Sequence, residues 1–293
     1  MRKILLTCLF GLLFVLAACG SNEGDTNDEA SGGKLDELKD SGKVTIGFAN
    51  EKPYAYEEDG ELKGAAVDIA KAVFKELGIE EMDSKLADFG QLIPGLKAGQ
   101  FDVITAGMAI NPDRCENAAF GEPEMMYGEG LIVQKGNPLN LKSYKDIADN
   151  PDVTVSVMSG ATENAFLKSE GVSEEQITNA EDIPATFSAV ESGRADATTG
   201  TEMTIKMALE SANSDQLEFV EGFEQPDVEG VPSYGAAAFH LDNTELRDAY
   251  NEKLAELKAD GTVAELLEAN GFSEENNMVS DDITTEKICN GEM

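Results

Sequence analysis

The sequence of 293 residues has no tryptophan, one histidine and four cysteines. With so few of these residues, no Cys/His cluster has the spacing of a metal site. A Ser-His-Asp set, an HExxH motif and a Gly-Lys-Ser/Thr phosphate loop are also absent from the sequence. These absences argue against a catalytic function, and we expect no cofactor and no metal.

Basic residues are scarce as well. Lys and Arg number 22 against 57 Asp and Glu, which gives a formal net charge of −35. The acidic excess is spread along the chain, so it repels nucleic acid and anionic lipid, and neither is expected as a partner. The charge exceeds what solubility needs. It is typical of a protein that faces concentrated salt, where screening shortens the range of self-repulsion.

The N-terminus has the pattern of a lipoprotein signal peptide. Arg2 and Lys3 are basic, residues 4–15 are almost wholly apolar, and the small residues 16–18 precede Cys19. The apolar run is short for a transmembrane helix. We therefore expect cleavage before Cys19, lipidation of this cysteine and an extracytoplasmic position at the cell membrane. A plain signal peptide with an incidental cysteine is the alternative.

A polar segment follows. Residues 20–33 (GSNEGDTNDEASGG) contain no large apolar side chain, so they cannot bury enough surface to offset the entropy of ordering. We expect a flexible tether over residues 20–42. Its polar part spans roughly 20 Å, enough to hold a domain clear of the membrane.

Two cysteines remain once the leader is cleaved and Cys19 is lipidated. Cys115 and Cys289 would lie in a compartment where disulfides persist, and two thiols allow one pairing. A bridge over so long a loop could contribute on the order of 5 kcal/mol in the chain-entropy model. Two unpaired buried thiols are the alternative.

Strand and helix patterns alternate after residue 43. Apolar residues in 66–77 follow the spacing of an amphipathic helix, and Gly78 stands where a C-cap is expected. The alternation predicts α/β lobes with mostly parallel sheets, and about 250 ordered residues suggest two lobes. The expected strands are 44–48, 101–106, 130–134, 153–158, 195–199, 217–221 and 236–239. The other expected helices are 88–98, 162–169, 183–193, 202–211, 244–259 and 263–269.

Three segments resemble the polar-amino-acid branch of the bacterial extracellular solute-binding proteins, family 3. They are residues 95–104 (GLKAGQFDVI), 106–108 (AGM) upstream of Arg114, and 192–197 (SGRADA). The resemblance covers about 43–272 and implies a two-lobed α/β fold of the periplasmic-binding-protein type II, with two hinge crossover strands. It places these strands near 131–134 and 234–239, lobe 1 at 43–132 plus 237–293, and lobe 2 at 133–236.

Within that family the sequence is most similar to ectoine/hydroxyectoine-binding proteins. The matching segments are 47–51 (GFANE), 53–54, 89–90, 92–96 and 107–116 (GMAINPDRCE). Ectoine is a compact zwitterion, with a carboxylate on a ring whose two nitrogens share a positive charge. The similarity implies a monomeric, lipid-anchored protein that captures this compatible solute for osmoprotection and passes it to an ABC permease in the membrane.

The similarity also implies roles for single residues. Arg114 can pair with both oxygens of a carboxylate, while Glu51 faces the cationic ring and aromatic faces surround it. Backbone N–H groups of residues 160–163 could share the carboxylate, with helix capping by Thr162 as the alternative. For the other side chains, core packing or a surface position is the alternative. The expected ligand-binding residues are Glu51, Tyr54, Phe89, Gly107, Ala109, Arg114, Gly160, Ala161, Thr162 and Thr201.

Two positions depart from the related patterns. Thr201 replaces the aspartate with which α-amino-acid binders hold an ammonium group, which argues against ordinary amino acids. Ala109 stands where ectoine binders usually place a third aromatic ring. Either another residue completes the aromatic wall, or the ligand differs.

Three other interpretations stay open. The first is a binding protein for a polar amino acid or a betaine. The second is a dehydratase-like enzyme on the same fold, which would need a positioned acid or base, and Glu51 is the one candidate. The third is a sensor ectodomain, which the lack of a membrane helix or signalling domain after the lobes makes a weak hypothesis.

Overall fold

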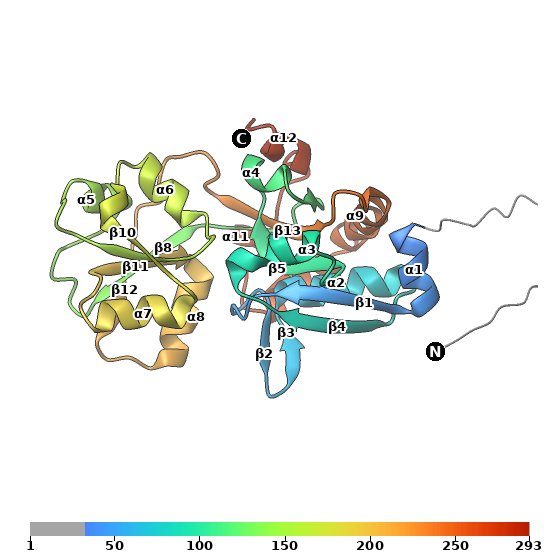
Figure 1. Ribbon diagram of the computed structural model, residues 1–293, viewed down its shortest axis with the longest axis horizontal. Coiled ribbons are helices and arrows are strands. Elements are labelled where there is room, and N and C mark those ends of the chain that lie inside the picture. Colours follow the sequence, from blue (N-terminus) through green and yellow to red (C-terminus); the bar gives the residue numbers. More distant parts are fainter. Residues whose placement is uncertain (1–32, 293) are drawn as a thin grey trace, which may run out of the picture. The chain divides into compact units, whose positions relative to one another are not determined.

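A computed structural model describes residues 33–292. Cys19, the predicted signal peptide and most of the predicted tether lie outside the described residues. The described chain forms a six-stranded sheet, a five-stranded sheet and a two-stranded hairpin, with helices packed on both large sheets (Figure 1). This is the two-lobed α/β architecture that the sequence predicts. No helix in this part of the chain is both long and apolar enough to span a membrane.

The six-stranded sheet has the order β4-β1-β5-β13-β6, and β7 also pairs with β13. Strand β1 is parallel to β4 and β5, whereas β13 is antiparallel to β5, β6 and β7. The strands are β1 (Lys43–Phe48), β4 (Glu81–Leu86), β5 (Val103–Ala109), β6 (Ala119–Phe120), β7 (Met125–Tyr127) and β13 (Ser233–Phe239). The hairpin is β2 (Tyr56–Glu58) with β3 (Glu61–Lys63).

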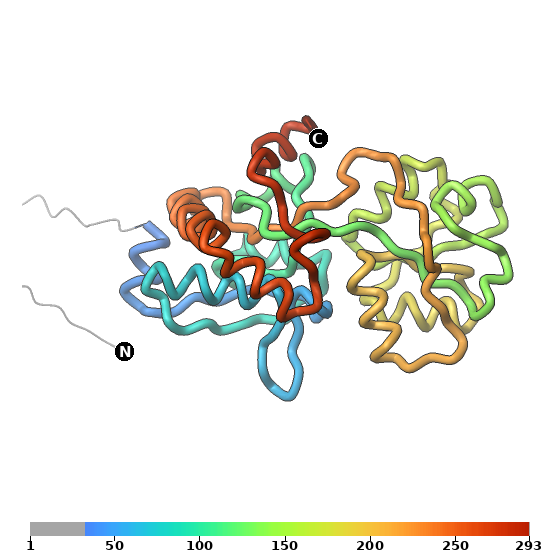
Figure 2. Tube along the Cα trace, turned by 180° about the vertical axis from the view of Figure 1, so that it is seen from behind, coloured from blue at the N-terminus to red at the C-terminus, as the bar shows by residue number. Residues whose placement is uncertain are grey.

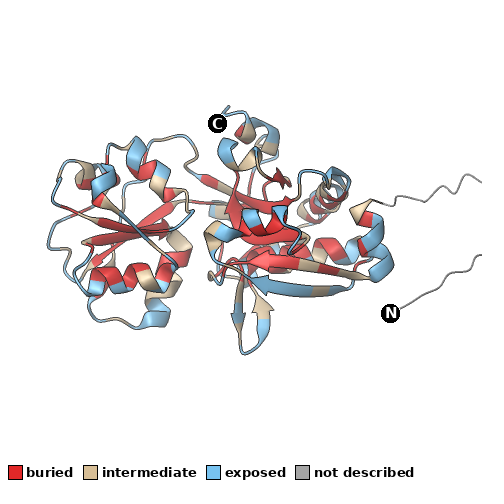
Figure 3. Ribbon diagram, in the orientation of Figure 1, coloured by how far each residue is buried: buried red, intermediate tan, exposed pale blue. Residues whose placement is uncertain are grey.

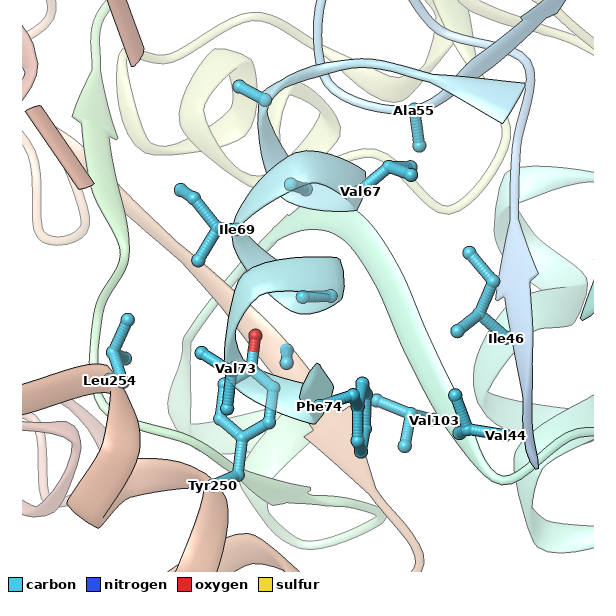
Figure 4. Close-up of a cluster of buried hydrophobic side chains, with 14 of the residues drawn as sticks. Val44, Ile46, Ala55, Val67, Ile69, Val73, Phe74, Val103, Tyr250 and Leu254 are labelled. Atoms are coloured by element: carbon cyan, nitrogen blue, oxygen red, sulfur yellow. The ribbon is translucent and has the colours of Figure 1, made fainter. Parts of the chain in front are cut away.

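Hydrophobic cores cover both faces of this sheet. All seven residues of β5 are buried, and its successive side chains serve opposite faces. On one face, Val73 and Phe74 of a helix pack with Val103 and Tyr250, as Figure 4 shows. The associated helices are α1 (Lys34–Ser41), α2 (Ala65–Glu76), α3 (Leu92–Lys97), α4 (Pro112–Cys115), α9 (Thr244–Ala259), α10 (Thr262–Ala269), α11 (Glu274–Asn277) and α12 (Thr285–Cys289), with the short 3₁₀ helix η1 (Phe89–Gln91) before α3.

The five-stranded sheet has the order β10-β9-β11-β8-β12. Strands β9, β10 and β11 are parallel, and β8 is antiparallel to both β11 and β12. The strands are β8 (Glu129–Gln134), β9 (Val155–Met158), β10 (Ile177–Ala180), β11 (Ala197–Thr201) and β12 (Leu217–Phe219). The helices are α5 (Tyr144–Ala148), α6 (Glu163–Ser169), η2 (Glu174–Gln176), α7 (Ile183–Glu191) and α8 (Glu202–Ala212). Buried residues concentrate in the strands and the inner helix faces (Figure 3).

Two segments connect the sheets (Figure 2). In the first, β7 ends at Tyr127 and β8 begins at Glu129. The second runs from β12 to β13, and its Gln225 side chain holds the first segment. The Glu129 N–H donates to Gln225 Oε1 at 2.7 Å, and Gln225 Nε2 donates to the Glu129 carbonyl at 2.8 Å. The residue ranges predicted for the two lobes stay predictions.

The structure differs from the sequence expectation at the predicted tether. Residues 34–41 of that range form helix α1, whose Leu35 and Leu38 are buried in the core of the six-stranded sheet. The helix is amphipathic, because these two leucines are three residues apart and lie on one face. This contact gives the segment the apolar burial that the preceding residues cannot provide.

Cys115 and Cys289 form a disulfide, with their Cα atoms 5.7 Å apart. This is the pairing that the sequence predicts for the two cysteines of the folded domain. The bond joins α4 to α12, the last helix, and so fixes the C-terminal segment beside Arg114.

Candidate ligand-binding site

A small pocket, called the cavity below, lies among loops and strand ends of both sheets. It is lined by residues that are far apart in the sequence. Nine of the ten predicted ligand-binding residues line it: Glu51, Tyr54, Phe89, Gly107, Ala109, Arg114, Ala161, Thr162 and Thr201. The tenth, Gly160, lies beside the cavity, where its carbonyl accepts a hydrogen bond from Arg114. The structure therefore brings the predicted set together.

A tight turn after β1 places Glu51 and Tyr54. The Glu51 N–H donates to the Ala55 carbonyl at 2.9 Å, and the Ala55 N–H donates back at 3.0 Å. The turn also supplies hydrogen-bond acceptors for the start of α2. The carbonyls of Pro53 and Tyr54 accept from the N–H groups of the first two residues of that helix. Held in this way, Glu51 and Tyr54 reach the cavity from the end of β1 in the six-stranded sheet.

Arg114 lies on α4, which Asn111 caps by accepting from the Arg114 N–H. Its Nη1 donates to the Ala109 carbonyl and its Nη2 to the Gly160 carbonyl, both at 2.8 Å. The guanidinium thus touches the end of β5 in the six-stranded sheet and the loop after β9 of the five-stranded sheet. It also lies 5.4 Å from the centroid of the Phe89 ring, so this ring contacts the guanidinium in a cation–π geometry.

Aromatic rings form one wall of the cavity. Tyr54 and Tyr127 meet edge to face with centroids 5.2 Å apart, and the Tyr127 hydroxyl donates to the Gly107 carbonyl at 2.6 Å. Gly107 has φ +58°, and a Cβ there would stand 2.4 Å from the Tyr54 ring. Tyr127 was not singled out from the sequence. It supplies a third ring, with Tyr54 and Phe89, in a cavity where Ala109 lacks one.

Residues 161–163, between β9 of the five-stranded sheet and the start of α6, also line the cavity. The Thr162 side chain makes no capping hydrogen bond with α6, so helix capping does not account for it. Thr162 lines the cavity together with Glu163, the first residue of α6. The Ala161 N–H donates to the Met158 carbonyl at 3.2 Å.

Two carboxyl groups stand close to the guanidinium. The pKa of Glu51 is raised to about 8, mainly by burial and also by the charge of Glu163, while Arg114 opposes the rise. Burial also raises the pKa of Glu163, against the pull of Arg114. Burial lowers the pKa of Arg114, while Glu163 and Glu51 raise it. Burial thus favours the neutral carboxyl groups, a cation bound beside them would favour their ionised forms, and the guanidinium suits an anionic group.

Sequence reasoning missed several residues of this site. Glu163 follows a turn and opens a helix, where an acidic residue ordinarily complements the helix dipole. Glu163 is only 3% exposed in the folded chain, and no local sequence pattern predicts this burial. The remaining unpredicted lining residues are Ala106, Tyr127, Met158, Ile183, Thr199 and Gly200. Within residues 33–292, no group of three or more His, Cys, Asp or Glu is arranged to hold a metal ion.

Comparison with known proteins agrees with this geometry. Residues 44–271 match the model of the bacterial extracellular solute-binding proteins, family 3. A probable amino-acid ABC transporter periplasmic-binding protein of Sinorhizobium fredii is 38% identical over 87% of this chain and 85% of its own length. The glutamine-binding protein GlnH of Bacillus subtilis is 30% identical over 91% and 96%.

A solved structure is similar as well. The crystal structure of EhuB in complex with hydroxyectoine has a TM-score of 0.78 and 36% identity, covering 87% of this chain and 97% of that one. The family match spans most of the chain, and the relatives named above are binding proteins of transporters. The chain therefore belongs to the bacterial extracellular solute-binding proteins, family 3, and is the solute-binding protein of an amino-acid-type ABC transporter.

Proposed function

We propose that the protein captures a small zwitterion with a delocalised cation, namely ectoine or hydroxyectoine, and presents it to the permease of an osmoprotective importer. The observation that carries the proposal is one cavity in which Arg114 stands opposite Glu51 and Glu163, beside three aromatic rings. A guanidinium for the carboxylate and two carboxylates for the cation match a zwitterion.

The carboxylate of the solute pairs with Arg114. A guanidinium has five N–H donors, and the Ala109 and Gly160 carbonyls each take one. The remaining donors suffice for a bidentate carboxylate. Thr162, whose hydroxyl caps no helix, can contribute a further hydrogen bond.

The cation of the solute lies between Glu51 and Glu163. An amidinium ring offers an N–H group on each of two nitrogens, so each carboxylate can accept one. A primary ammonium is a compact point charge that the side chain at position 201 would help to hold, but Thr201 is uncharged, and its hydroxyl donates to Thr204 Oγ1 at 2.9 Å. The similarity to EhuB, crystallised with hydroxyectoine, supports the same ligand class.

Calorimetric titration tests the proposal. We expect saturable heat with ectoine and hydroxyectoine, and weaker or no heat with glutamine, arginine and glycine betaine. The names of the amino-acid-binding relatives favour the alternative ligand, a polar amino acid. Tight binding of an amino acid and none of ectoine would replace ectoine by that amino acid, and turnover of any added solute would restore the dehydratase hypothesis.

The pH dependence of binding follows from Glu51. Its pKa of about 8 in the ligand-free cavity means that it is protonated at neutral pH. A cationic ligand favours the ionised form, so binding releases a proton, and affinity rises as the pH rises toward 8. We expect about tenfold tighter ectoine binding near pH 8.5 than near pH 6.5. Titrations in buffers of different protonation enthalpy measure the released proton.

Glu51→Gln isolates this effect. Glutamine cannot ionise, so this variant should bind weakly and release less than half as many protons as the wild type. Glu61→Gln, an exposed carboxyl on β3, is the matched control and should behave as the wild type. A wild-type affinity that is flat over this pH range would contradict the assignment.

We further propose that Cys19 carries the lipid that holds the protein at the outer face of the membrane as a monomer. The sequence around Cys19 supports this. In cells, Cys19→Ser should release the protein from the membrane fraction. Retention of this variant in the membrane fraction would refute lipid attachment at this residue.

A further inference from the structure

A second carboxyl group lies behind Glu163. Glu129, the first residue of β8, is 1% exposed, and Glu163 is 3% exposed. Their side chains are within hydrogen-bonding reach of each other. Both carboxyl oxygens of Glu129 and Oε2 of Glu163 are buried and have no other hydrogen-bond partner in residues 33–292. Glu129 lies outside the set of cavity-lining residues, so contact with a solute does not explain it.

Two ionised carboxylates could not remain in this arrangement. No cation of residues 33–292 offsets the burial of Glu129, and the negative charge of Glu163 adds to the penalty. Arg114 instead favours the ionised form of Glu163, because its charge lowers the pKa of that carboxyl. A single proton resolves the conflict, because a protonated carboxyl can donate to its ionised neighbour and satisfy oxygens that otherwise have no partner.

The backbone prevents Glu129 from turning its side chain toward solvent. Gln225 binds both its N–H and its carbonyl, and in the sheet Glu129 is paired with Thr201 of β11. The next residue, Gly130, is equally confined, since a Cβ there would lie 2.8 Å from side-chain atoms of Ile205 and Phe219. The carboxyl pair is therefore a fixed part of the second lobe.

We propose that Glu129 is a positioning residue of the ligand site: it holds a proton at neutral pH and donates it to Glu163 in a hydrogen bond. The pair then presents one negative charge, on the oxygen of Glu163 that faces the cavity. This proposal deepens the proposed function, because the charge is directed at the cation of the solute. Full ionisation of the pair would add a buried negative charge on Glu129, and no cation of the described residues acts on that group.

Other titratable groups also surround the pair. Glu51 is the one that changes charge near neutral pH, since its pKa is about 8. Burial raises the pKa of each nearby tyrosine, so these hydroxyls stay neutral. The groups that face the pair from neighbouring elements are Glu51, Tyr54, Arg114, Tyr127 and Tyr144.

Infrared spectroscopy of the ligand-free protein tests the proton directly. Near pH 9, Glu51 and the buried Glu124, with pKa values of about 8 and about 7, are mostly ionised. We expect a carbonyl band of a protonated carboxylic acid to persist there in the wild type and to disappear in Glu129→Gln. Absence of the band in the wild type, or its persistence in Glu129→Gln, overturns the proposal whether or not ectoine binds.

Ectoine titration tests the positioning. Glu129→Gln keeps an N–H donor for Glu163, so its affinity should stay within about threefold of the wild type. Glu129→Leu removes the donor, and affinity should fall about tenfold or more. Glu124→Gln is the matched control: this buried carboxyl accepts from Tyr250 at 2.6 Å, lies outside the cavity and should leave binding unchanged. Equal affinity in Glu129→Gln and Glu129→Leu would contradict the positioning role, and if Glu129→Leu does not fold, the infrared result decides.

Discussion

Arg114→Ala is expected to weaken ectoine binding by about two to three orders of magnitude, the largest change of any single substitution in the site. Removing one member of a buried charge pair costs about 3–5 kcal/mol, because the other member stays desolvated without a partner. Here the solute carboxylate would lose a bidentate donor, and Glu51 and Glu163 would lose the positive charge that offsets their own repulsion. Calorimetric titration measures the loss.

Arg114→Lys separates charge from geometry. Lysine keeps the positive charge but has no planar fork. It cannot bind the Ala109 and Gly160 carbonyls and a carboxylate in the same arrangement. We expect an affinity between those of the wild type and Arg114→Ala. Arg194→Ala is the matched control, since the side chain of this exposed arginine hydrogen-bonds only with Ser192 among the described residues. If Arg114→Ala bound ectoine as the wild type does, Arg114 would not be the carboxylate partner.

Many of the longer helices and core strands follow from local sequence signals. Helix α9 spans residues 244–259 as its pattern predicts, and α2 is within one residue of the expected bounds, with Gly78 in the left-handed region after it. Such signals are local, because they depend on apolar spacing and on caps. The parallel core strands are apolar enough to be found in the same way. Edge strand β4 (EMDSKL) is mostly exposed and carries no such pattern, so it was not predicted.

The candidate site was predicted where the chain resembles a known family and missed where it depends on tertiary burial. Arg114 and the turn at residues 51–54 lie in matching motifs. Tyr127 lies in a three-residue strand without a motif, and only the fold places its ring against Tyr54. Glu129 and Glu163 are ordinary acidic residues in sequence, in a chain with 57 of them. Their role in the site depends on the contact between β8 and the start of α6, which no local sequence pattern predicts.

The disulfide carries the second large effect. The Cys115–Cys289 bond closes a loop over a sequence separation of 174 residues. In the chain-entropy model, such a cross-link stabilises the folded state by about 5 kcal/mol, mainly by restricting the unfolded chain. We expect the double variant Cys115→Ser/Cys289→Ser to lose up to about this free energy of unfolding in denaturant titrations.

Ligand binding should respond to the same bond. Cys115 is the neighbour of Arg114 on α4, and α4 has only four residues, so α12 supports it through the disulfide. A four-residue helix is not stable by itself. Loss of the disulfide should therefore increase the mobility of Arg114. Ectoine binding should weaken about tenfold or less, far less than in Arg114→Ala. A reductant should reproduce both effects in the wild type and neither in the double variant. Equal unfolding midpoints for the oxidised and reduced wild type would show that other contacts of α12, such as Thr285 Oγ1 donating to the Gly121 carbonyl, hold the C-terminal segment without the bond.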